Sequence, residues 1–478
     1  MTTLRASCGG RRISCSTDSS DTGTGERISS TRPSTSTSGA VERDFGKRWG
    51  EDPLERVNVL IAGGGVIGTT LAHELAKRGV NDIHVIDLDL GGLYASSELN
   101  AGGARATWWQ PINIETCRIT LDFFRAHREL FGFRETGYLW LYADPDRFAV
   151  ACEKRTLQEA AGITVELLRR DEITRRFPIL DRNLEELVGA TWSPRDGLVN
   201  PNAVRAYHRR EAEKLGVRFS DRHFIDGVET ARIDGRSGLR RVRGVDVIEV
   251  AGGDPTDTSG ILREILTTHR VPTGRRARET RISCDVVVNC LGAWSSIFSS
   301  KIGLRDVTEA VRRQIALVDV RPADLVPGVD LDRLGMIVDS SDLYFHPEAG
   351  HFLAGYSIPD EVPGFDFSYD GNAYFEEFVW PRLAHRCSSF ERCGHLRGWS
   401  GLYAVTPDRS GIAGPVPGIA NLLEAHSLTG RGVMQSFGIA TVLAERITTG
   451  HYGACDLGPL GRERFESPDR WLPEVLHI

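Results

Sequence analysis

The chain has 478 residues, of which 40% are hydrophobic and 26% charged, an ordinary balance for a globular protein with room for two domains. Its formal net charge of -7 argues against a nucleic-acid partner, and no apolar run is long enough for a transmembrane helix. The nine cysteines form no CxxC pair and no common zinc spacing, so we expect reduced thiols of an intracellular protein and no metal site.

Residues 1–50 differ from the rest because they are rich in Ser and Thr and poor in apolar side chains. Such a segment cannot bury enough surface to offset its ordering entropy, so we expect a disordered tail. The first residues carry three arginines and no acidic residue, as in an organelle transit peptide, but acidic residues follow from Asp18 onwards. We therefore predict a cytoplasmic protein, with an organellar location (mitochondrion or plastid) as the alternative.

A β-turn-α-β unit opens the folded region. Val57–Ala62 is a short apolar strand, Gly63–Gly68 is glycine-rich, Thr69–Gly79 has helical periodicity, and Ile83–Asp87 is a second strand. Three elements of this type within a few tens of residues are typical of the first unit of a dinucleotide-binding fold.

The glycine run has the GxGxxG pattern through Gly63, Gly65 and Gly68. The first glycine allows a tight turn, the second lets the backbone approach a pyrophosphate, and the third lets the helix pack closely on the strand. Asp87 ends the second strand, where a carboxylate accepts hydrogen bonds from a ribose, and Asp89 is a weaker candidate. A carboxylate at this position argues against the 2′-phosphate of NADP, but it does not distinguish NAD from FAD.

Further along, helices are predicted at 111–132, 201–215 and from the 430–432 turn to about Ile447. Strands are predicted at Tyr138–Tyr142, Val217–Phe219, Val242–Val250, Asp285–Cys290, within 314–356, and near Asn421–Ala425. Residues 251–280 are rich in Gly, Thr, Pro and Arg, which predicts an extended hairpin loop.

Five motifs together identify a family. Gly401–Asp408 has the sequence GLYAVTPD, and it is followed by Leu422–Gly432 and an apolar helix. With Gly63–Gly68, Asn100–Gly103 and Val286–Trp294, the chain resembles the D-amino-acid oxidase superfamily over about residues 56–450. Its similarity is greatest to the branch that holds sarcosine oxidase, dimethylglycine dehydrogenase, glycine oxidase and proline dehydrogenase β-subunits.

This resemblance implies an α/β plus α+β fold, with a Rossmann-like FAD-binding domain and a mostly antiparallel-sheet substrate domain. We expect the FAD-binding domain to be assembled from 56–105, 196–300 and 396–450. The substrate domain is expected from 106–195 and 301–395, with 451–478 as a C-terminal extension.

The cofactor site is expected at two glycine-rich turns. The resemblance implies that amides of the Ser427–Gly432 turn face the flavin pyrimidine edge, where a helix N-terminus favours negative charge. The residues expected to bind FAD are Gly63, Gly64, Gly65, Val66, Ile67, Gly68, Asp87, Ser96, Ser97, Asn100, Ala101, Gly102, Gly103, Gly292, Gly430, Arg431, Gly432 and Val433.

Departures from the family pattern concern FAD attachment and the electron acceptor. Asn100 and Gly401 occupy positions where some branches attach FAD covalently through His or Cys, so FAD is expected to be non-covalent. Leu353 and Met434 stand where sarcosine-oxidase-like members have lysines, which favours an acceptor other than oxygen. The acceptor is left open among oxygen, a quinone and a flavoprotein.

Four residues are candidates for catalysis. Arg105 follows the first flavin loop, where family members often hold a substrate carboxylate, and a guanidinium fork suits that group. Arg431 replaces a frequent family His beside the flavin. Tyr344 and His346 lie on a stretch that lines the pocket in this family. A purely structural role is the alternative for each.

Three functions are compatible with these residues. The first is FAD-dependent oxidation of the C–N bond of an amino acid or a secondary or tertiary amine, by hydride transfer to flavin N5. The second is an FAD-dependent 2-hydroxy-acid dehydrogenase, for which His346 is the clear candidate base. The third is a non-catalytic FAD-binding respiratory-complex assembly factor, because fold alone does not choose between them.

Overall fold

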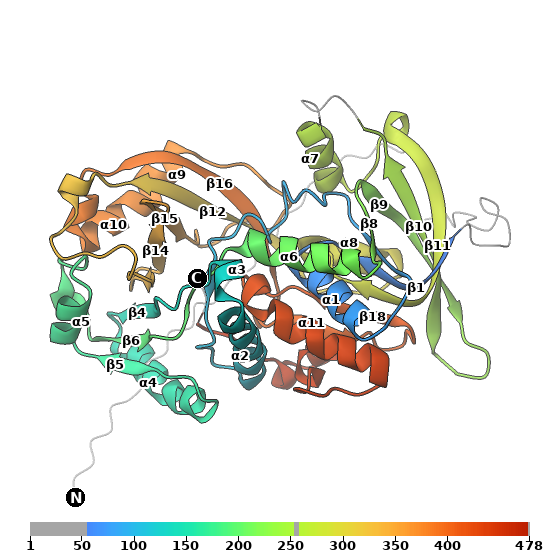
Figure 1. Cartoon of the computed structure of the whole chain (residues 1–478), viewed down its shortest axis with the longest axis horizontal. Helices are drawn as coiled ribbons and strands as arrows, with labels where there is room; N and C mark the ends of the chain where they lie inside the picture. The colour runs from blue at the N-terminus through green and yellow to red at the C-terminus, as the bar shows by residue number, and fades with distance from the viewer. Residues whose placement is uncertain (1–54, 253–257, 477–478) are drawn as a thin grey trace, which may run out of the picture. The chain divides into compact units, whose positions relative to one another are not determined.

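Two eight-stranded sheets form the framework of the protein, in a computed structural model that describes residues 55–252 and 258–476 (Figure 1). These residues belong to one compact unit. The N-terminal tail expected to be disordered lies outside the described residues.

The first sheet has the strand order β17-β18-β11-β1-β2-β8. Its parallel strands are β1 (Glu55–Ala62), β2 (Ile83–Ile86), β8 (Arg218–Ser220), β11 (Arg276–Asn289) and β18 (Leu422–His426). β17 (Ile412–Pro415) is an antiparallel edge strand, and β9 (His223–Arg232) and β10 (Arg240–Val250) extend β11 as an antiparallel meander. The apolar runs of β1 and β2 suit a parallel sheet that is covered on both faces.

Helices from distant parts of the sequence pack against this sheet. α1 (Val66–Lys77) contacts α6 (Pro201–Lys214) and α11 (Gly432–Thr449), and α11 packs on α2 (Pro111–Ala126). The helix expected at 111–132 is interrupted at His127 and resumes as α3 (Arg128–Phe131). The buried side chains of these helices form one core with β1 and β2.

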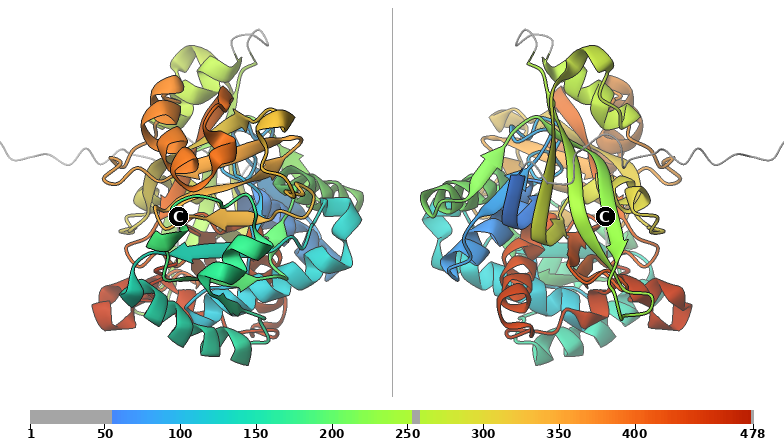
Figure 2. Two further views of the ribbon diagram at one scale, coloured as in Figure 1. Left: turned by 90° about the vertical axis from the view of Figure 1, so that its left-hand side faces the viewer. Right: turned by 90° about the vertical axis from the view of Figure 1, so that its right-hand side faces the viewer.

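The second sheet has the order β16-β12-β15-β14-β13-β4-β6-β5, and it is antiparallel except for the β13–β4 pair. Its strands are β4 (Tyr138–Tyr142), β5 (Glu166–Leu168), β6 (Gly189–Ser193), β12 (Glu309–Asp319), β13 (Met336–Val338), β14 (Leu343–Glu348), β15 (His351–Tyr356) and β16 (Gly394–Val405). Figure 2 shows its helices, which are α4 (Pro145–Ala160), α5 (Arg170–Arg176), α9 (Asn372–Tyr374) and α10 (Trp380–Arg386). Two-residue strands β3 (Gly103–Ala104) and β7 (Gly197–Leu198) pair with each other. The mixed α/β class with a mostly antiparallel second sheet is as predicted.

The prediction of an extended hairpin loop over residues 251–280 is wrong in part, because this range contains the helix α7 (Thr258–Thr268). Ile261, Leu262, Ile265 and Leu266 lie on one face of this helix and form a core with Ile248 and Val250 of β10. The i, i+1, i+4, i+5 spacing of these four residues is helical. The glycines, prolines and arginines that flank the helix dominate the composition of residues 251–280, so the composition of that range indicated a loop.

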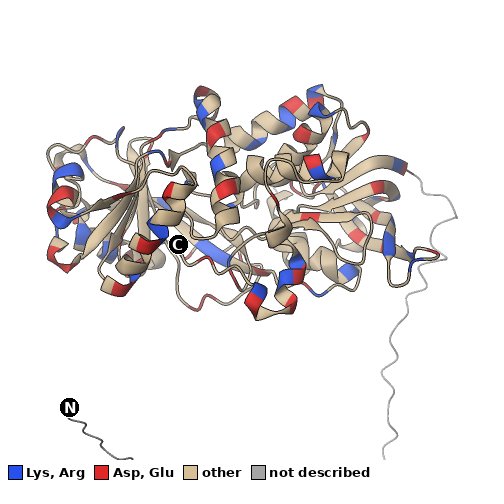
Figure 3. Cartoon of the chain, turned by 90° about the horizontal axis from the view of Figure 1, so that it is seen from below, with Lys and Arg blue, Asp and Glu red and all other residues tan. Residues whose placement is uncertain are grey.

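Figure 3 shows charged residues of both signs on several helices. Strands β10 and β11 also carry charged residues, whereas α11 has only Glu445 and Arg446. Within the part of the chain that the structure describes, no helix has the length and apolar character needed to cross a membrane.

Candidate cofactor and substrate site

A cavity of about 220 Å³, called the larger cavity below, lies at the carboxyl ends of β1, β2, β11 and β18. Parallel sheets bind ligands at this edge, because the loops that follow the strands leave a crevice there. Its wall includes Gly63 after β1, Asp87 after β2, Gly292 after β11 and Gly430 after β18.

One end of this cavity is the N-terminus of α1. Gly63 has φ +106°, and a Cβ on it would stand 2.4 Å from the Cys290 carbonyl oxygen, so only glycine fits. Gly65 at the N-cap supplies no side-chain acceptor, and the Val66 amide donates to Ser97 Oγ at 2.9 Å. The first amides of a helix lack intrahelical partners and favour anions, so this turn suits a diphosphate.

Asp87 lies at the adjacent wall. Its Oδ2 accepts a hydrogen bond from the Gly64 amide at 2.5 Å, and its Oδ1 accepts one from the Asp89 amide at 2.8 Å. Burial raises the pKa of Asp87, while the two amide hydrogen bonds act to lower it. Each carboxylate oxygen retains a lone pair for a ribose hydroxyl. Asp89 also lines the cavity, but its oxygens accept from the amides of Gly92 and Tyr94.

The N-terminus of α11, which begins at Gly432 without a side-chain cap, also lines the cavity and lies next to that of α1, since a Cβ on Gly432 would stand 4.0 Å from Val66 Cγ1. The turn before α11 contains Ser427 at φ +58°, Thr429 at φ +46° and Gly430 at φ +80°. These residues and Val433 line the cavity. Two non-glycine residues in the left-handed region carry backbone strain, which is common where a turn contacts a ligand.

The predicted cofactor residues divide into three groups. Lining the larger cavity are Gly63, Gly65, Val66, Ile67, Asp87, Ser96, Ser97, Asn100, Gly292, Gly430, Gly432 and Val433. Ala101, Gly102 and Gly103 line a neighbouring smaller cavity, while Gly64, Gly68 and Arg431 line neither. Gly68 instead packs α1 on the Gly63 turn, since a Cβ there would stand 1.9 Å from the Gly63 carbonyl oxygen.

These walls fit a bound FAD. The N-termini of α1 and α11, neither with a side-chain acceptor from its N-cap residue, line the same cavity, and the half-buried Asp87 carboxylate lies on its wall. Asn100, at one position of covalent attachment in related branches, hydrogen-bonds its own loop: Nδ2 donates to the Ser97 carbonyl, and Oδ1 accepts from the Gly102 amide.

A smaller cavity of about 50 Å³ adjoins the Thr429–Gly430 turn, where the flavin end of the cofactor is expected. It shares Asn100, Tyr403, Thr429, Gly430 and Val433 with the larger cavity. Its remaining lining residues are Ala101, Gly102, Gly103, Arg105, Trp108, Tyr138, Met336, Tyr344 and Met434. The described lining is thus aromatic and apolar around one cation.

That cation, Arg105, is 1% exposed. Its guanidinium lies 3.4 Å above the Trp108 ring and 4.7 Å from the Trp140 ring. Its Nη1 donates to the Thr107 carbonyl and its Nη2 to the Leu476 carbonyl, so neutral oxygens hold the fork. Burial lowers the pKa of Arg105, and nearby Tyr138 and Glu474 oppose that shift.

Tyr344 and His346 occupy different environments. Tyr344 lines the smaller cavity, and burial raises the pKa of its phenol. His346 lines neither cavity. Its ring nitrogens lie 3.0 Å from the Pro347 carbonyl oxygen and 2.9 Å from the Ala101 carbonyl oxygen, and burial lowers its pKa. His346 therefore supports the 100–103 loop from behind.

Arg431 is fully buried behind the smaller cavity. Its guanidinium lies 4.8 Å from the Trp108 ring, and its Nη2 donates to the Arg409 carbonyl. Its Nε and Nη1 atoms have no hydrogen-bond partner. Burial lowers the pKa of Arg431 to about 10.

Several residues of the site were missed in the sequence. Arg205 of α6 donates to the carbonyls of Gly64 and Leu90 and pairs with Glu98, so it ties two loops of the cofactor site together. Its chemistry carries no local signal in an arginine-rich chain. Tyr403 and Trp294 also line the larger cavity. Tyr403 lies within the GLYAVTPD motif, and its place in that motif could have identified it as a site residue.

Comparisons with known proteins identify the family of this chain. The family model described as FAD dependent oxidoreductase matches residues 58–446. The protein belongs to this family of FAD-dependent oxidoreductases, in the D-amino-acid oxidase superfamily.

Among its relatives, the FAD-dependent oxidoreductase domain-containing protein 1 of Xenopus laevis is 28% identical, over 88% of this chain and 85% of that protein. The crystal structure of L-proline dehydrogenase from P. horikoshii superimposes with a TM-score of 0.69 and 21% identity, covering 86% of this chain and 98% of that one. Glycine oxidase from Geobacillus kaustophilus gives a TM-score of 0.65 and 21% identity, covering 85% and 98%.

Proposed function

We propose that the protein oxidises the C–N bond of a small amino acid or secondary or tertiary amine that carries a carboxylate. The observation that carries this proposal is the smaller cavity, where one buried arginine stands among aromatic rings at the flavin end of the cofactor site. When bound, FAD supplies the hydride acceptor at N5.

In this proposal, Arg105 binds the substrate carboxylate. The guanidinium is already held by two main-chain carbonyls and by the Trp108 and Trp140 rings, so little ordering remains when an anion arrives. A buried cation without an acidic partner in the described lining also favours an anionic ligand.

The size of the cavity restricts the substrate. At about 50 Å³ it is far smaller than the larger cavity of about 220 Å³, which favours a small substrate. Aromatic walls exclude water from the reacting carbon and hold it in one orientation.

The lining lacks a general base among its described residues. Burial raises the pKa of Tyr138, Tyr344 and Tyr403, so these phenols stay protonated. An amine needs no such base if it enters neutral, because its own lone pair completes the iminium. A 2-hydroxy acid needs a base for its hydroxyl proton, and His346 faces the carbonyls of Ala101 and Pro347 instead.

Anaerobic reduction of the flavin tests this proposal. Purified protein is mixed under nitrogen with glycine, sarcosine, proline and dimethylglycine, with the matched 2-hydroxy acids and with the decarboxylated amines, and the flavin absorbance is followed. We expect at least one amino acid to bleach the flavin faster than its decarboxylated amine and its hydroxy analogue. Bleaching by 2-hydroxy acids alone would replace the proposal, and no bleaching by any compound would favour the non-catalytic role.

Heat or acid precipitation tests the mode of FAD attachment in the same preparation. Because Asn100 and Gly401 occupy the attachment positions, the flavin should appear in the supernatant. Yellow colour that stays with the precipitate would contradict a non-covalent cofactor.

A further inference from the structure

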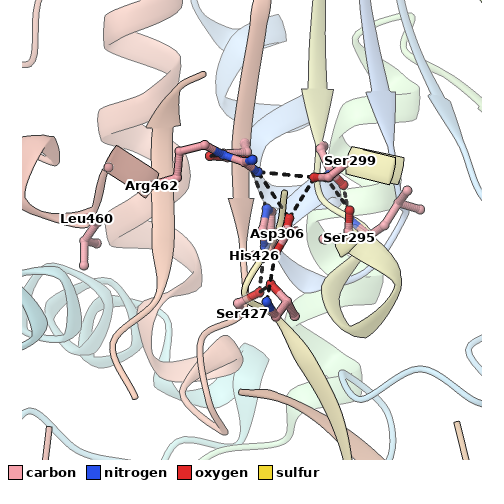
Figure 4. Close-up of polar contacts among 12 residues, drawn as sticks. Ser295, Ser299, Asp306, His426, Ser427, Leu460 and Arg462 are labelled. Atoms are coloured by element: carbon pink, nitrogen blue, oxygen red, sulfur yellow. Dashed lines mark hydrogen bonds and ion pairs between the residues drawn. The ribbon is translucent and has the colours of Figure 1, made fainter. Parts of the chain in front are cut away.

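A buried polar cluster lies behind the turn that forms the flavin end of the cofactor cavity. Its hydrogen bonds bring together Glu424 and His426 of β18, Ser427 of the turn, Ser299 of α8 (Ser295–Lys301), Asp306 and Thr308 before β12, and Arg462 of the 3₁₀ helix η9 (Arg462–Glu466). Figure 4 shows Arg462 close to Ser299 and Asp306, and His426 directed toward Ser427. Four separate stretches of the chain therefore meet behind one turn.

His426 connects the charged part of this cluster to the turn. Its Nε2 lies 3.2 Å from Glu424 Oε2, and its Nδ1 lies 2.7 Å from Ser427 Oγ. The ring is fully buried, so it contacts these groups and not solvent. Ser427 Oγ also lies 2.7 Å from Thr308 Oγ1.

Arg462 joins the two carboxylates of the cluster. It donates to Glu424 Oε1 at 2.7 Å and to Asp306 Oδ2 at 3.2 Å, so one guanidinium serves two carboxylates. Although burial raises the pKa of Asp306, the neighbouring His426 and hydrogen bonds from Thr308 and Ser299 lower it to about 2. The ion pairs fix the carboxylate side of the cluster, and His426 links that side to the turn.

The turn needs such support. Ser427 and Thr429 have φ of +58° and +46°, which costs free energy in residues that carry a Cβ. The Ser427 hydroxyl is held on two sides, by His426 and by Thr308, and the Thr429 amide donates to the Ala404 carbonyl at 3.0 Å. These contacts hold the left-handed conformation that brings the turn and the first amides of α11 to the cavity wall.

We propose that His426, bound between Glu424 and Ser427, is a positioning residue that holds the Ser427–Gly430 turn and so sets how strongly the α11 N-terminus favours reduced over oxidised FAD. His426 is among the residues that line the larger cavity, but its side chain is fully buried, so it acts through Ser427. The inference concerns the cofactor and is independent of the substrate proposed above.

The test measures the two-electron midpoint potential and the visible spectrum of bound FAD by dye equilibration, without any substrate. In His426→Gln we expect preferential binding of the reduced flavin to fall about tenfold, equivalent to a potential about 30 mV more negative. Thr308→Val, which is nearly isosteric and lies outside the cavity lining, should shift the potential in the same direction by a smaller amount because it breaks one of the two Ser427 contacts.

A matched control separates positioning from general loss of stability. His208 is a fully buried histidine of α6 that contacts His73 and lines neither cavity. His208→Gln should lower the melting temperature and leave the potential unchanged. If His426→Gln and Thr308→Val also lower the melting temperature while the potential and spectrum stay as in the parent, the cluster is only structural and the proposal is overturned. If His426→Gln does not fold, Thr308→Val alone decides by its potential.

Discussion

The two cavities differ in the elements that form their walls. Two glycine-rich turns, one before α1 and one before α11, contribute main chain to the wall of the larger cavity, beside apolar side chains such as Leu266 and Phe298. The smaller cavity is walled mainly by side chains, from β4, β13, β14 and β16 as well as the loop after β3. A cofactor shared by a whole family can be held by backbone, whereas a substrate that differs between members is selected by side chains that can change independently.

The largest expected effect tests the main-chain wall. Gly63→Ala puts a Cβ 2.4 Å from the Cys290 carbonyl oxygen at φ +106°, so the turn has to move away from the diphosphate. Losing about 3 kcal/mol of charge-assisted hydrogen bonds would lower FAD affinity about a hundredfold. Flavin content after purification and fluorescence titration of the apoprotein measure it.

Gly79→Ala is the control for this variant. Gly79 follows the other end of α1 at φ +81°, but a Cβ there would meet nothing within 4 Å. We expect it to cost about 1 kcal/mol of stability from backbone strain alone, with normal FAD content. Equal FAD loss in both variants would show that strain, and not the close approach to β11, explains the first result.

Arg105→Gln tests the side-chain wall. Because a hydrogen bond to a charged group contributes about 1.5–3 kcal/mol, KM for a carboxylate substrate, or the Kd of a carboxylate inhibitor, should rise about ten- to a hundredfold, with FAD retained. Arg386→Gln is the control, since Arg386 is equally buried but pairs with Asp339 away from both cavities. A KM that is unchanged in Arg105→Gln would remove Arg105 from substrate binding.

The same difference between the two cavities explains which site residues could be predicted from the sequence. Gly63, Gly65 and Asp87 stand at fixed spacings because one short β-turn-α-β unit positions them, so a local pattern is enough. Tyr138, Met336 and Tyr403 come together only when strands far apart in sequence pair in the second sheet, and no local pattern encodes that pairing. His346 shows the limit of sequence-based prediction most clearly. It lies on β14 with Tyr344, but it contacts the Ala101 carbonyl of the 100–103 loop and does not line the smaller cavity.

Asp87→Ala should weaken FAD binding about ten- to a hundredfold, because it removes a carboxylate worth about 1.5–3 kcal/mol as a charged acceptor. The protein should still fold, since Asp87 contacts only two amides of the neighbouring turns. Isothermal titration of the apoprotein with FAD measures the change. Asp89→Ala is compared in parallel, and a larger loss there would assign the ribose to Asp89.

The pH dependence of kcat/KM should follow the substrate and not the protein. Below its pKa the neutral fraction of an amine rises tenfold for each pH unit, and the phenols of the smaller cavity remain protonated because burial raises their pKa. Activity should therefore rise with pH until the amine is deprotonated. Two substrates whose amine pKa values differ should give profiles displaced by that difference, whereas a common inflection would reveal a titrating group of the protein.

The smallest expected effect concerns the electron acceptor. Of the two positions where related oxidases have lysines, Leu353 and Met434, we expect only Met434 to affect the reaction with oxygen. Met434 lines the smaller cavity, while Leu353 is buried on β15 and lines neither cavity. A lysine at Met434 would place a cation beside the flavin end, where it stabilises the negative charge that oxygen acquires on accepting an electron. Met434→Lys should speed reoxidation of the reduced protein in air about tenfold, equal to ~1.4 kcal/mol, without speeding reduction by substrate.

Leu353→Lys, with its ammonium in the core of the second sheet, should instead lower the melting temperature and leave the air reaction slow. Stopped-flow mixing of reduced protein with air-saturated buffer distinguishes them. If the unmodified protein already reoxidises in air faster than it turns over, an apolar residue at 434 does not suppress the oxygen reaction, and the protein is an oxidase.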